Sequence, residues 1–577
     1  MALSIFRHAA QAAVMLVLAL PGAGLAQTDA GAASGAYLAG RQAVRDSDFD
    51  TAVQYYARAL GQDPDNPALM ENVTLSQLAL GRIARALPVA QYMEELGLRS
   101  QVAHMVVVAN LIVAEEYDTL LARDTEAVGI GPLVDGLVIG WAYMGAGSVS
   151  KALTQFDTVA EQSGLRGFAL YHKAMALAMV GDFEGAEAIF ADEDGRLSSM
   201  ARRAALARAQ ILSQLDRNED ALEILADAFG GGSDPELTRM ADLLAAGTKL
   251  PYDHVTSVRE GLAEVFFIIG AALSGETSDD YALVYARLAG FLRPDHNDAL
   301  LLSADLLDGL GQYDLAVETY KQVPQDSSDH YAAELGRAEA LRRAAKPDAS
   351  IEVLEQLAQD YPNLPLVYSA LGDLQRQQES YEAAVLAYDK ALDFTEEGAA
   401  GRWFLLYARG ISLERLDEWD RAEADFREAL KLSPNQPQVL NYLGYSMVEK
   451  QTNLDEALDM IERAVAARPD SGYIVDSLGW VLYRLGRYDE AVAHMEQAVE
   501  LMPVDAVVND HLGDVFWAVG RQREAEFQWR RALSFVDPDD TDAEADPERI
   551  RRKLEVGLDK VLAEEGADPL TVADDDR

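Results

Sequence analysis

Hydrophobic and polar positions along this chain follow a helical period, and the whole pattern recurs about every 34 residues. Gly444, Gly479 and Gly513 are 35 and 34 residues apart, and they lie in the similar settings NYLGYSMV, DSLGWVLY and NDHLGDVFW. Downstream of each glycine come a Glu-Ala pair, a bulky residue four positions after that alanine, and another alanine three positions further. A fixed period of this length predicts one supersecondary unit per repeat, stacked on its neighbours.

Each unit is predicted to contain two antiparallel helices, the first with the glycine and the second with the Glu-Ala pair. Glycine and alanine allow the two helices to approach closely, and the bulky residue fills the space between them. Proline follows several copies, and it ends the second helix because proline cannot continue a helix interior. We place about 13 copies along the chain, at 33–66, 67–100, 133–166, 167–200, 202–235, 263–296, 297–330, 331–364, 365–398, 403–436, 437–471, 472–505 and 506–538.

These positions resemble those of the tetratricopeptide repeat (TPR) over most of the chain, most closely between residues 365 and 536. The resemblance implies an all-α fold, a right-handed superhelical solenoid of about 13 helix-turn-helix repeats with a C-terminal capping helix. Solenoids of this kind mostly bind other molecules rather than catalyse reactions.

Two stretches interrupt the repeat pattern. Residues 101–132 are apolar but lack the repeat signature, and residues 229–262 begin with FGGGSDPE. We interpret 229–262 as an irregular joint between an N-terminal repeat segment, 33–228, and a C-terminal repeat segment, 263–538.

The C-terminal residues, 539–577, are predicted to hold an acidic loop, a capping helix and an acidic tail. The helix is expected from about Glu548 to Glu564, because Ile550, Leu554, Leu558 and Leu562 share one stripe at helical spacing. A terminal repeat needs its open edge covered, which is the role we assign to this helix.

Composition and the N-terminus indicate an exported acidic protein. Lys and Arg number 49 against 96 Asp and Glu, a net charge of −47, and there is no cysteine. This charge disfavours nucleic acid and anionic membranes as partners, and the lack of cysteine excludes disulfides, thiol catalysis and Cys-linked lipid. Residues 1–26 combine a basic start, an apolar run from Ala9 to Leu20 and a Gly-Leu-Ala site before Gln27, the layout of a signal peptide.

The alternative for residues 1–26 is an uncleaved membrane anchor. The apolar run is shorter than the roughly 20 residues that span a bilayer. We therefore expect cleavage and a periplasmic protein, peripheral to the outer membrane at most, without stable membrane insertion after signal cleavage.

The search for catalytic and metal-binding motifs indicates no enzyme. The eight histidines are dispersed, and none has a metal-ligand spacing. Neither a Gly-Lys-Ser/Thr phosphate loop nor a GxSxG elbow occurs. The Asp-rich run at 537–546 lacks the glycine and the terminal glutamate of a calcium loop, and a solvated linker explains it. We expect no catalytic residue, no metal and no cofactor.

What remains is a strip of side chains on the first helices of the last four repeats. With the glycine as position 8, positions 2, 5, 9 and 12 cluster roughly 120° away from the face that packs on the second helix. In the resembled family this second face lines the concave groove. The candidate binding residues on it are Phe404, Tyr407, Asn441, Tyr445, Tyr473, Asp476, Trp480, Tyr483, Asp510, Asp514 and Trp517. A weaker strip consists of Trp141, Met144, Phe168, Tyr171 and Met175.

Surface aromatics ringed by polar groups are typical of binding hot spots. The alternative is that these rings pack between adjacent helices as core. Some members of the family clamp a peptide carboxylate with Lys and Arg, whereas the matching positions here are acidic or aromatic. That departure favours a basic or amide-rich protein or peptide partner.

These observations predict an extracytoplasmic scaffold or adaptor that holds proteins or peptides in a TPR groove. The stretch from Gly444 to Leu533 resembles bacterial cell-envelope repeat proteins, among them outer-membrane adaptors that present substrates to carboxyl-terminal processing proteases. One alternative is an assembly factor for exported polymer or outer-membrane machinery, and an enzyme of unknown type is the third interpretation. The sequence indicates neither the oligomeric state nor the identity of the partner.

Overall fold

The computed structural model describes residues 25–192, 201–229, 235–536, 545–567 and 570. The expected signal peptide lies outside these residues except for Leu25 and Ala26, and most of the expected acidic loop and tail lies outside them too. The described residues form the helices α2 to α33 and no strands, so the all-α prediction is confirmed. The chain divides into two compact units, Met1–Tyr361 and Pro362–Arg577, here called the N-terminal unit and the C-terminal unit.

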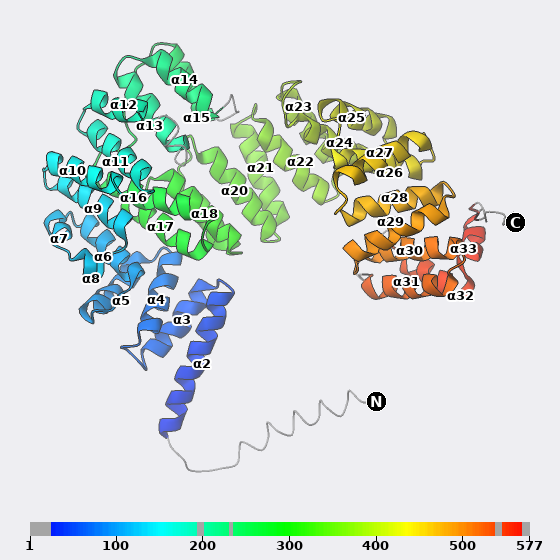
Figure 1. Ribbon diagram of the computed structural model, residues 1–577, viewed down its shortest axis with the longest axis horizontal. Coiled ribbons are helices and arrows are strands. Elements are labelled where there is room, and N and C mark those ends of the chain that lie inside the picture. The colour runs from blue at the N-terminus through cyan, green and yellow to red at the C-terminus, as the bar shows by residue number, and fades with distance from the viewer. Residues whose placement is uncertain (1–24, 193–200, 230–234, 537–544, 568–569, 571–577) are drawn as a thin grey trace. The chain divides into compact units, whose positions relative to one another are not determined.

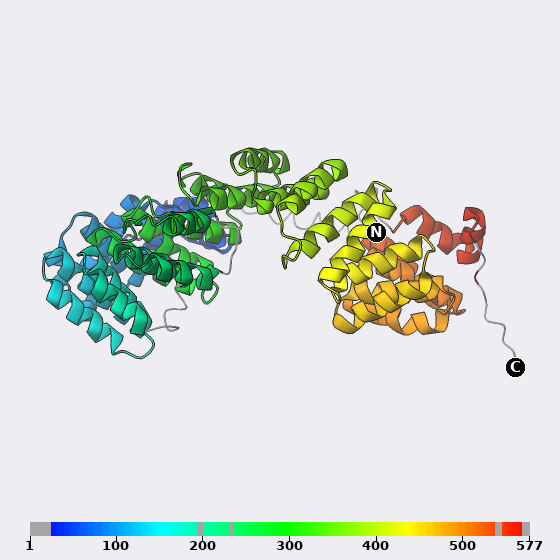
Figure 2. The ribbon, with the colours of Figure 1, turned by 90° about the horizontal axis from the view of Figure 1, so that it is seen from above.

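Most helices of the N-terminal unit are the first and second helices of successive repeats, which lie side by side in Figures 1 and 2. They are α2 (Leu25–Arg45), α3 (Phe49–Leu60), α4 (Pro67–Ala79), α5 (Ile83–Glu95), α6 (Gln101–Val113), α7 (Tyr117–Leu121), α8 (Thr125–Val128), α9 (Pro132–Gly145), α10 (Val149–Ala160), α11 (Arg166–Met179), α12 (Phe183–Asp192), α13 (Ala201–Gln214), α14 (Asn218–Phe229), α15 (Pro235–Ala245), α16 (Val258–Leu273), α17 (Asp279–Leu292), α18 (Asn297–Gly309), α19 (Tyr313–Tyr320), α20 (His330–Arg343) and α21 (Pro347–Asp360).

Helices α16 and α17 fold back onto earlier repeats of the N-terminal unit. α16 packs on α9 and α11, and α17 packs on α4 and α6 (Figure 1). Ten consecutive residues of α16, from Gly261 to Gly270, are buried, and all but Glu264 are apolar. A helix that is apolar all round needs neighbours on every side. α6 is similar, with Val102 to Ala109 all buried, which explains why 101–132 are apolar without the repeat signature.

The predicted joint, 229–262, lies inside the N-terminal unit and holds α15 and an irregular segment, 246–257. This segment is fastened to α13. The backbone N–H of Leu250 donates to Ser213 Oγ at 2.8 Å, and Gln210 exchanges two hydrogen bonds with Asp253. Irregular backbone that packs against the protein must satisfy its polar groups in this way. The segment 246–257 is therefore a packed connection, and the first compact unit extends beyond it to Tyr361.

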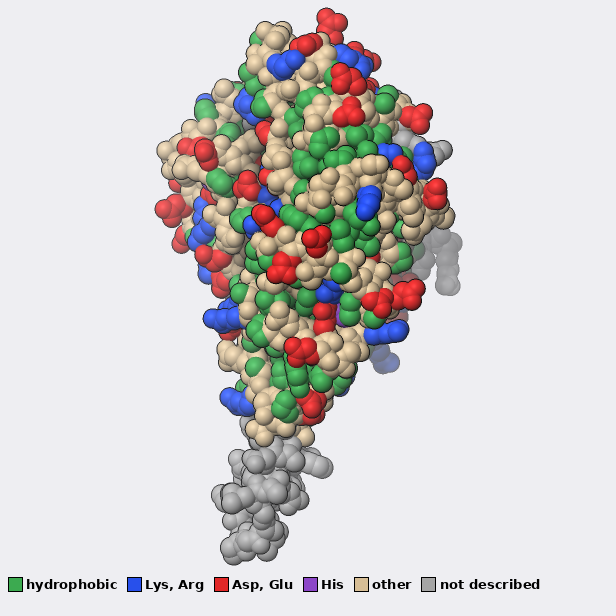
Figure 3. Space-filling view, turned by 90° about the vertical axis from the view of Figure 1, so that its left-hand side faces the viewer, with side chains coloured by type: hydrophobic (Ala, Val, Ile, Leu, Met, Phe, Trp, Pro, Cys, Tyr) green, Lys and Arg blue, Asp and Glu red, His purple; other side chains and the backbone are tan. Residues whose placement is uncertain are grey.

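The surface of the N-terminal unit mixes both charges. On the face shown in Figure 3, acidic and basic side chains are interspersed among apolar ones. The large negative charge of the chain is therefore not gathered into one patch on that face. Among the described residues, no helix combines the length and apolar character that crossing a bilayer requires.

The described residues of the C-terminal unit form five complete helix pairs and a shorter terminal pair (Figure 1). Its helices are α22 (Pro365–Gln377), α23 (Tyr381–Asp393), α24 (Arg402–Arg415), α25 (Trp419–Leu432), α26 (Pro437–Glu449), α27 (Leu454–Ala467), α28 (Gly472–Arg484), α29 (Tyr488–Leu501), α30 (Ala506–Ala518), α31 (Gln522–Phe535), α32 (Pro547–Val556) and α33 (Leu558–Glu565).

The repeat glycines bring the two helices of each pair into close contact, as their spacing predicts. A Cβ atom added at Gly479 would lie 2.7 Å from Met495 Cγ, and one at Gly444 would lie 2.8 Å from Ile461 Cγ1. Both distances are too short for a carbon–carbon contact, so these positions leave room only for glycine. Met495 and Ile461 are fully buried in a core that extends from α23 to α33.

The C-terminal cap is present as two short helices, α32 and α33, where a single helix was expected from about Glu548 to Glu564. Gly557 separates them with a φ of 86°, a conformation that favours glycine. A Cβ atom at Gly557 would lie 2.5 Å from Trp517 Cζ2. The helix is therefore broken where the chain passes over the Trp517 ring. Ile550 and Leu558 join the core of the last repeats.

Candidate functional site

Five of the predicted binding residues form what we call the aromatic face, on α24, α26 and α28. They are Phe404, Tyr407, Tyr445, Tyr473 and Trp480, all exposed or half-buried. Tyr473 and Phe404 are the most open, with 49% and 39% of their surface exposed. Burial, with the nearby Tyr473 hydroxyl, raises the pKa of Tyr407 to about 12, so this phenol stays protonated at neutral pH. Aromatic surface that remains in water marks a candidate contact surface.

Contacts within the C-terminal unit hold part of the aromatic face in place. Trp480 stacks on Tyr483 and His511, with ring centroids 4.8 and 4.0 Å apart. Its indole Nε1 donates a hydrogen bond to Glu449 at 3.0 Å. Rings that are already fixed lose little conformational freedom when a partner binds.

The three predicted groove carboxylates, Asp476, Asp510 and Asp514, are buried and paired inside the protein. His511 Nδ1 lies 3.0 Å from Asp476 Oδ2, which joins α30 to α28. Lys553 of α32 donates to Asp510 at 2.8 Å and to Asp514 at 2.7 Å, with none of its side chain exposed. These carboxylates connect successive first helices, and none lies where a partner would meet it.

The remaining predicted residues are also largely covered. Tyr483 is only 8% exposed. Trp517 is half-buried, and its Nε1 donates to Asp559 of α33 at 2.9 Å. Asn441 is 7% exposed, and its Oδ1 has no hydrogen-bond partner in the described part of the chain. The cap therefore covers the C-terminal end of the predicted strip.

The weaker strip expected in the N-terminal repeats lies in the core. Trp141, Tyr171 and Met175 are completely buried. Trp141 packs against Gly261 of α16, where a Cβ atom would lie 2.5 Å from the indole ring, and its Nε1 donates to His172 Nδ1 at 3.2 Å. Predicting this strip as a groove was wrong, because α16 covers it.

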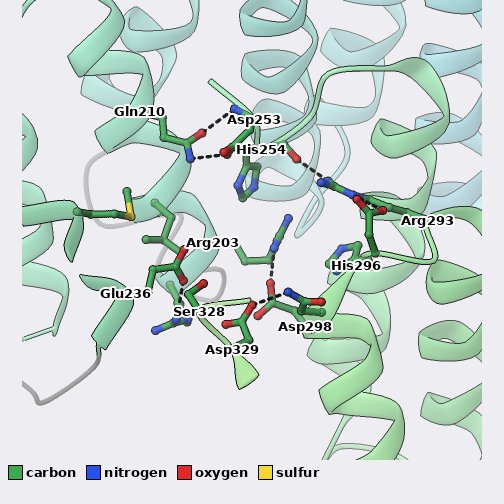
Figure 4. A pocket seen from close by; sticks show the side chains of 15 residues that line it. Arg203, Gln210, Glu236, Asp253, His254, Arg293, His296, Asp298, Ser328 and Asp329 are labelled. Carbon is green, nitrogen blue, oxygen red and sulfur yellow. Dashed lines mark hydrogen bonds and ion pairs between the residues drawn. The ribbon is translucent and has the colours of Figure 1, made fainter. Parts of the chain in front are cut away.

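A polar cavity of about 380 Å³ opens in the N-terminal unit, where five segments converge (Figure 4). These segments are α13, α15, the irregular segment 246–257, the turn into α18 and the residues before α20. The lining contains five carboxylates, three guanidiniums and two imidazoles, and only Leu206 and Met240 are apolar. Figure 4 shows Arg203 and His254 pointing into the cavity.

A buried ionic network centred on Glu264 of α16 lies behind this cavity. Arg203 of α13 donates from Nε and Nη2 to the two carboxylate oxygens at 2.7 Å each, and it also pairs with Asp298 of α18. The Tyr171 hydroxyl donates to Glu264 Oε1 at 2.7 Å, and His296 Nε2 lies 3.3 Å from Oε2. The network thus joins α11, α13, α16 and α18.

The electrostatics of the network follow from burial and from the guanidinium. Burial alone would raise the pKa of Glu264, but the Arg203 charge and the His296 hydrogen bond hold it well below its usual range, so Glu264 is ionised. Burial, with the Arg203 charge adding to it, lowers the pKa of His254 to about 3, so this imidazole is neutral at physiological pH. Groups so perturbed beside a cleft are candidates for a functional site.

Sequence reasoning missed this cavity, because its lining comes from separate segments that no short motif joins. In the sequence, His254 and His296 have no metal-ligand spacing. Within the described ranges, no group of three or more His, Asp or Glu lies where it could hold a metal ion.

Comparison with known families accounts for the repeats. A tetratricopeptide repeat model matches residues 37–97, 137–199, 335–399, 407–472 and 448–506, and a second tetratricopeptide repeat model matches 298–330. These matches cover more than half of the chain. The chain belongs to the tetratricopeptide repeat family. TPR proteins generally mediate protein–protein interaction, and the TPR fold is typically a non-catalytic scaffold.

The individual proteins that this chain resembles share little sequence identity with it. A TPR repeat-containing protein of Pseudomonas aeruginosa is 27% identical over 173 residues, which is 30% of this chain and 28% of that protein. A tetratricopeptide repeat protein of Parabacteroides merdae is 17% identical over 45% of this chain and 97% of its own, with a TM-score of 0.37. The Cut9–Hcn1 hetero-tetramer of APC/C is 14% identical over 91% and 96%, with a TM-score of 0.38. Both structural likenesses are too distant to support an argument about function.

Proposed function

We propose that this protein is an extracytoplasmic scaffold that holds a protein or peptide partner on the aromatic face of its C-terminal unit. One observation carries the proposal. The five aromatics stay exposed or half-buried on successive first helices, whereas the neighbouring carboxylates and the strip in the N-terminal repeats are buried. Exposed aromatic clusters supply most of the binding free energy in many interfaces.

The partner we propose carries Lys, Arg or amide donors beside an apolar anchor. Glu449 accepts a hydrogen bond from Trp480, and Glu414 accepts one from Tyr442 at 3.4 Å, so carboxylates adjoin the aromatic rings. The chain as a whole carries a net charge of −47, which speeds the approach of basic partners. Asp476, Asp510 and Asp514 take no part in this recognition, because they are paired internally.

The compartment we propose is the periplasm. The proposal rests on the signal-peptide layout of residues 1–26, with small residues before Gln27. N-terminal sequencing of the protein from its native host should find Gln27 first in the periplasmic fraction. Intact protein that begins at Met1 and stays in the cytosol would contradict this localisation.

Within the envelope, we propose that the scaffold presents substrates to a carboxyl-terminal processing protease. The support is the resemblance of the stretch from Gly444 to Leu533 to envelope adaptors, together with the aromatic face that lies within and beside it. The full chain, copurified from envelope extract, should bring down such a protease, identified by mass spectrometry. Recovery of outer-membrane assembly components in its place would favour an assembly factor.

The binding face is tested by Tyr473→Ala, because Tyr473 is the most open residue of the aromatic face. Once the partner is identified, calorimetry should show at least about 30-fold weaker binding, the equivalent of a 2 kcal/mol hot spot. The melting temperature should change little, since half of the ring is already in water.

The matched control is Phe527→Ala on α31. Phe527 is 59% exposed and lies outside the aromatic face, so its loss removes similar surface without touching the proposed contact. Binding should be unchanged in this variant. If Tyr473→Ala binds as tightly as the parent chain, the partner uses another surface and the proposal fails.

A further inference from the structure

Two buried polar atoms in the lining of the N-terminal cavity have no hydrogen-bond partner among the described residues. They are Arg293 Nε, which is a donor, and Asn297 Oδ1, which is an acceptor. Both residues belong to the turn from α17 into α18. A buried donor or acceptor that stays unpaired costs free energy, so most such atoms in a folded protein are paired. Two of them side by side in sequence, on one cavity, indicate a place where a polar ligand binds.

Neighbouring contacts fix the orientation of both groups. Asn297 Nδ2 donates to Asp329 Oδ2 at 2.9 Å. Because an ionised carboxylate only accepts, the amide nitrogen faces Asp329 and the amide oxygen is left to meet another donor. Arg293 Nη1 donates to the carbonyl of His254 at 2.8 Å (Figure 4), and its Nε lies 3.4 Å from Asp295 without a hydrogen bond between them. The lining therefore offers one unused donor and one unused acceptor.

The charges of the lining disfavour a ligand with a net charge of either sign. An anion would meet five carboxylates, and the guanidiniums of Arg202, Arg203 and Arg293 already lie within 3.6 Å of carboxylate oxygens. A cation would meet those three guanidiniums in turn. Groups that are uncharged and both donate and accept fit such a lining, because they can bond to carboxylates and guanidiniums alike.

We propose that this cavity binds an uncharged polyhydroxyl ligand, a single monosaccharide ring whose hydroxyls accept from Arg293 Nε and donate to Asn297 Oδ1. Each hydroxyl carries one donor and two acceptor sites, so adjacent hydroxyls can meet both unused atoms and also bond to the carboxylates around them. A single amide would meet the two atoms but would leave the rest of the polar lining to water.

The dimensions and the composition of the cavity agree with a sugar ring. Its volume of about 380 Å³ is at the small end of ligand pockets. Only Leu206 and Met240 are apolar in the lining, so a hydrophilic ligand gives up little water-like contact on entering. The site lies in the N-terminal unit, so it does not depend on binding at the aromatic face.

Ligand-observed NMR titrations of the full chain with glucose, galactose and mannose test the proposal. At least one hexose should bind with a dissociation constant below roughly 10 mM. The uronate and the amino sugar of the hexose that binds best add a negative and a positive charge to the same ring, and both should bind more weakly. The methyl glycoside separates two sources of the sugar. Equal or tighter binding of the glycoside identifies the end of a glycan, and weaker binding identifies a free monosaccharide.

The decisive variant is Arg293→Lys, which keeps the positive charge but removes the Nε–H donor. It should raise the dissociation constant of the hexose at least about tenfold, the effect of losing one hydrogen bond from a charged group. Leu206→Phe is a second variant, which narrows the cavity from a half-buried position without changing a charge and should also weaken binding about tenfold. Arg342→Lys is the matched control, because Arg342 pairs with Glu339 on α20 and does not line the cavity. Its affinity should equal that of the parent chain.

The proposal is overturned if none of the three hexoses binds below roughly 10 mM, or if the uronate, the amino sugar or acetamide binds more tightly than the hexose. It is also overturned if Arg293→Lys binds the hexose as tightly as the parent chain, since the sugar then lies elsewhere. Should Arg293→Lys lower the melting temperature, Leu206→Phe decides, and unchanged affinity in that variant excludes this cavity as the site.

Discussion

Trp141 and Trp480 hold the same place in their repeats, directly after the first-helix glycine, yet their surroundings are opposite. Trp141 is fully buried against Gly261 of α16. Trp480 is half-buried, and its indole bonds to Glu449, which is exposed. The repeat pattern is the same, and what differs is the helix that packs over it. The same position in the repeat therefore belongs to the core in the N-terminal unit and to a candidate binding surface in the C-terminal unit.

Truncation of each indole should have a different cost in the two units. Trp141→Ala should lower the free energy of unfolding of the N-terminal unit by about 3–5 kcal/mol, the usual cost of truncating a buried aromatic. Trp480→Ala should cost the C-terminal unit less, about 1–2 kcal/mol, since part of its surface is already in water. Urea denaturation, followed by hydrogen exchange in peptides from each unit, measures both. Equal losses would mean that Trp480 belongs to the core as well.

Acid should destabilise the N-terminal unit more than the C-terminal unit. Burial lowers the pKa of His172 to about 4 and that of His254 to about 3, against about 6.5 in the unfolded chain. Below pH 6.5 the unfolded chain takes up these protons while the folded unit does not. Stability is therefore complete above pH 6.5 and is lost as the pH falls toward 4, with a loss of about 2 kcal/mol per histidine at pH 5.

Hydrogen exchange at pH 7 and pH 5 checks this expectation when rates are corrected for intrinsic exchange. Protection in the N-terminal unit should fall more than protection in the C-terminal unit. His172→Phe provides the control, because it removes one of the two titrating groups and should roughly halve the difference between the two pH values. An unchanged difference in this variant would show that other groups cause the acid sensitivity.

The close packing of α16 can be tested with a smaller change. Gly261→Ala places a methyl group against the Trp141 ring and should cost about 1–3 kcal/mol in the N-terminal unit. Gly290→Ala on the adjacent α17 is the matched control, because a Cβ atom there meets nothing within 4 Å. This second change should stabilise the helix by about 0.5–1 kcal/mol. If Gly261→Ala and Gly290→Ala shift the melting temperature in the same direction, the packing described for α16 is contradicted.

Much of the fold was predictable from the sequence, because glycine and bulky residues at fixed spacing impose the helix pairs locally. Gly479 and Met495 meet as their positions in the repeat require. The burial of α16 also has a signal in the sequence. Leu262 to Gly270 are apolar on nearly every side, and such a helix needs to be covered all round.

The candidate sites were less predictable, because they depend on distant partners. The burial of Asp510 and Asp514 is decided by Lys553, which lies some 40 residues further along the chain. The cavity brings together α13, α15 and the start of α18 only after the chain has folded back. Position within a repeat therefore predicted which residues share a face, but not whether that face stays open.

Lys553 lies on α32, which covers the end of the repeat array that would otherwise be exposed to solvent. α32 stands where the next first helix would stand, and it supplies the cation that Asp510 and Asp514 need when they leave water. These ion pairs join α32 to α30. A change in the number of repeats far upstream would leave these ion pairs in place. We therefore expect the same terminal helices to suit a scaffold with more or fewer repeats.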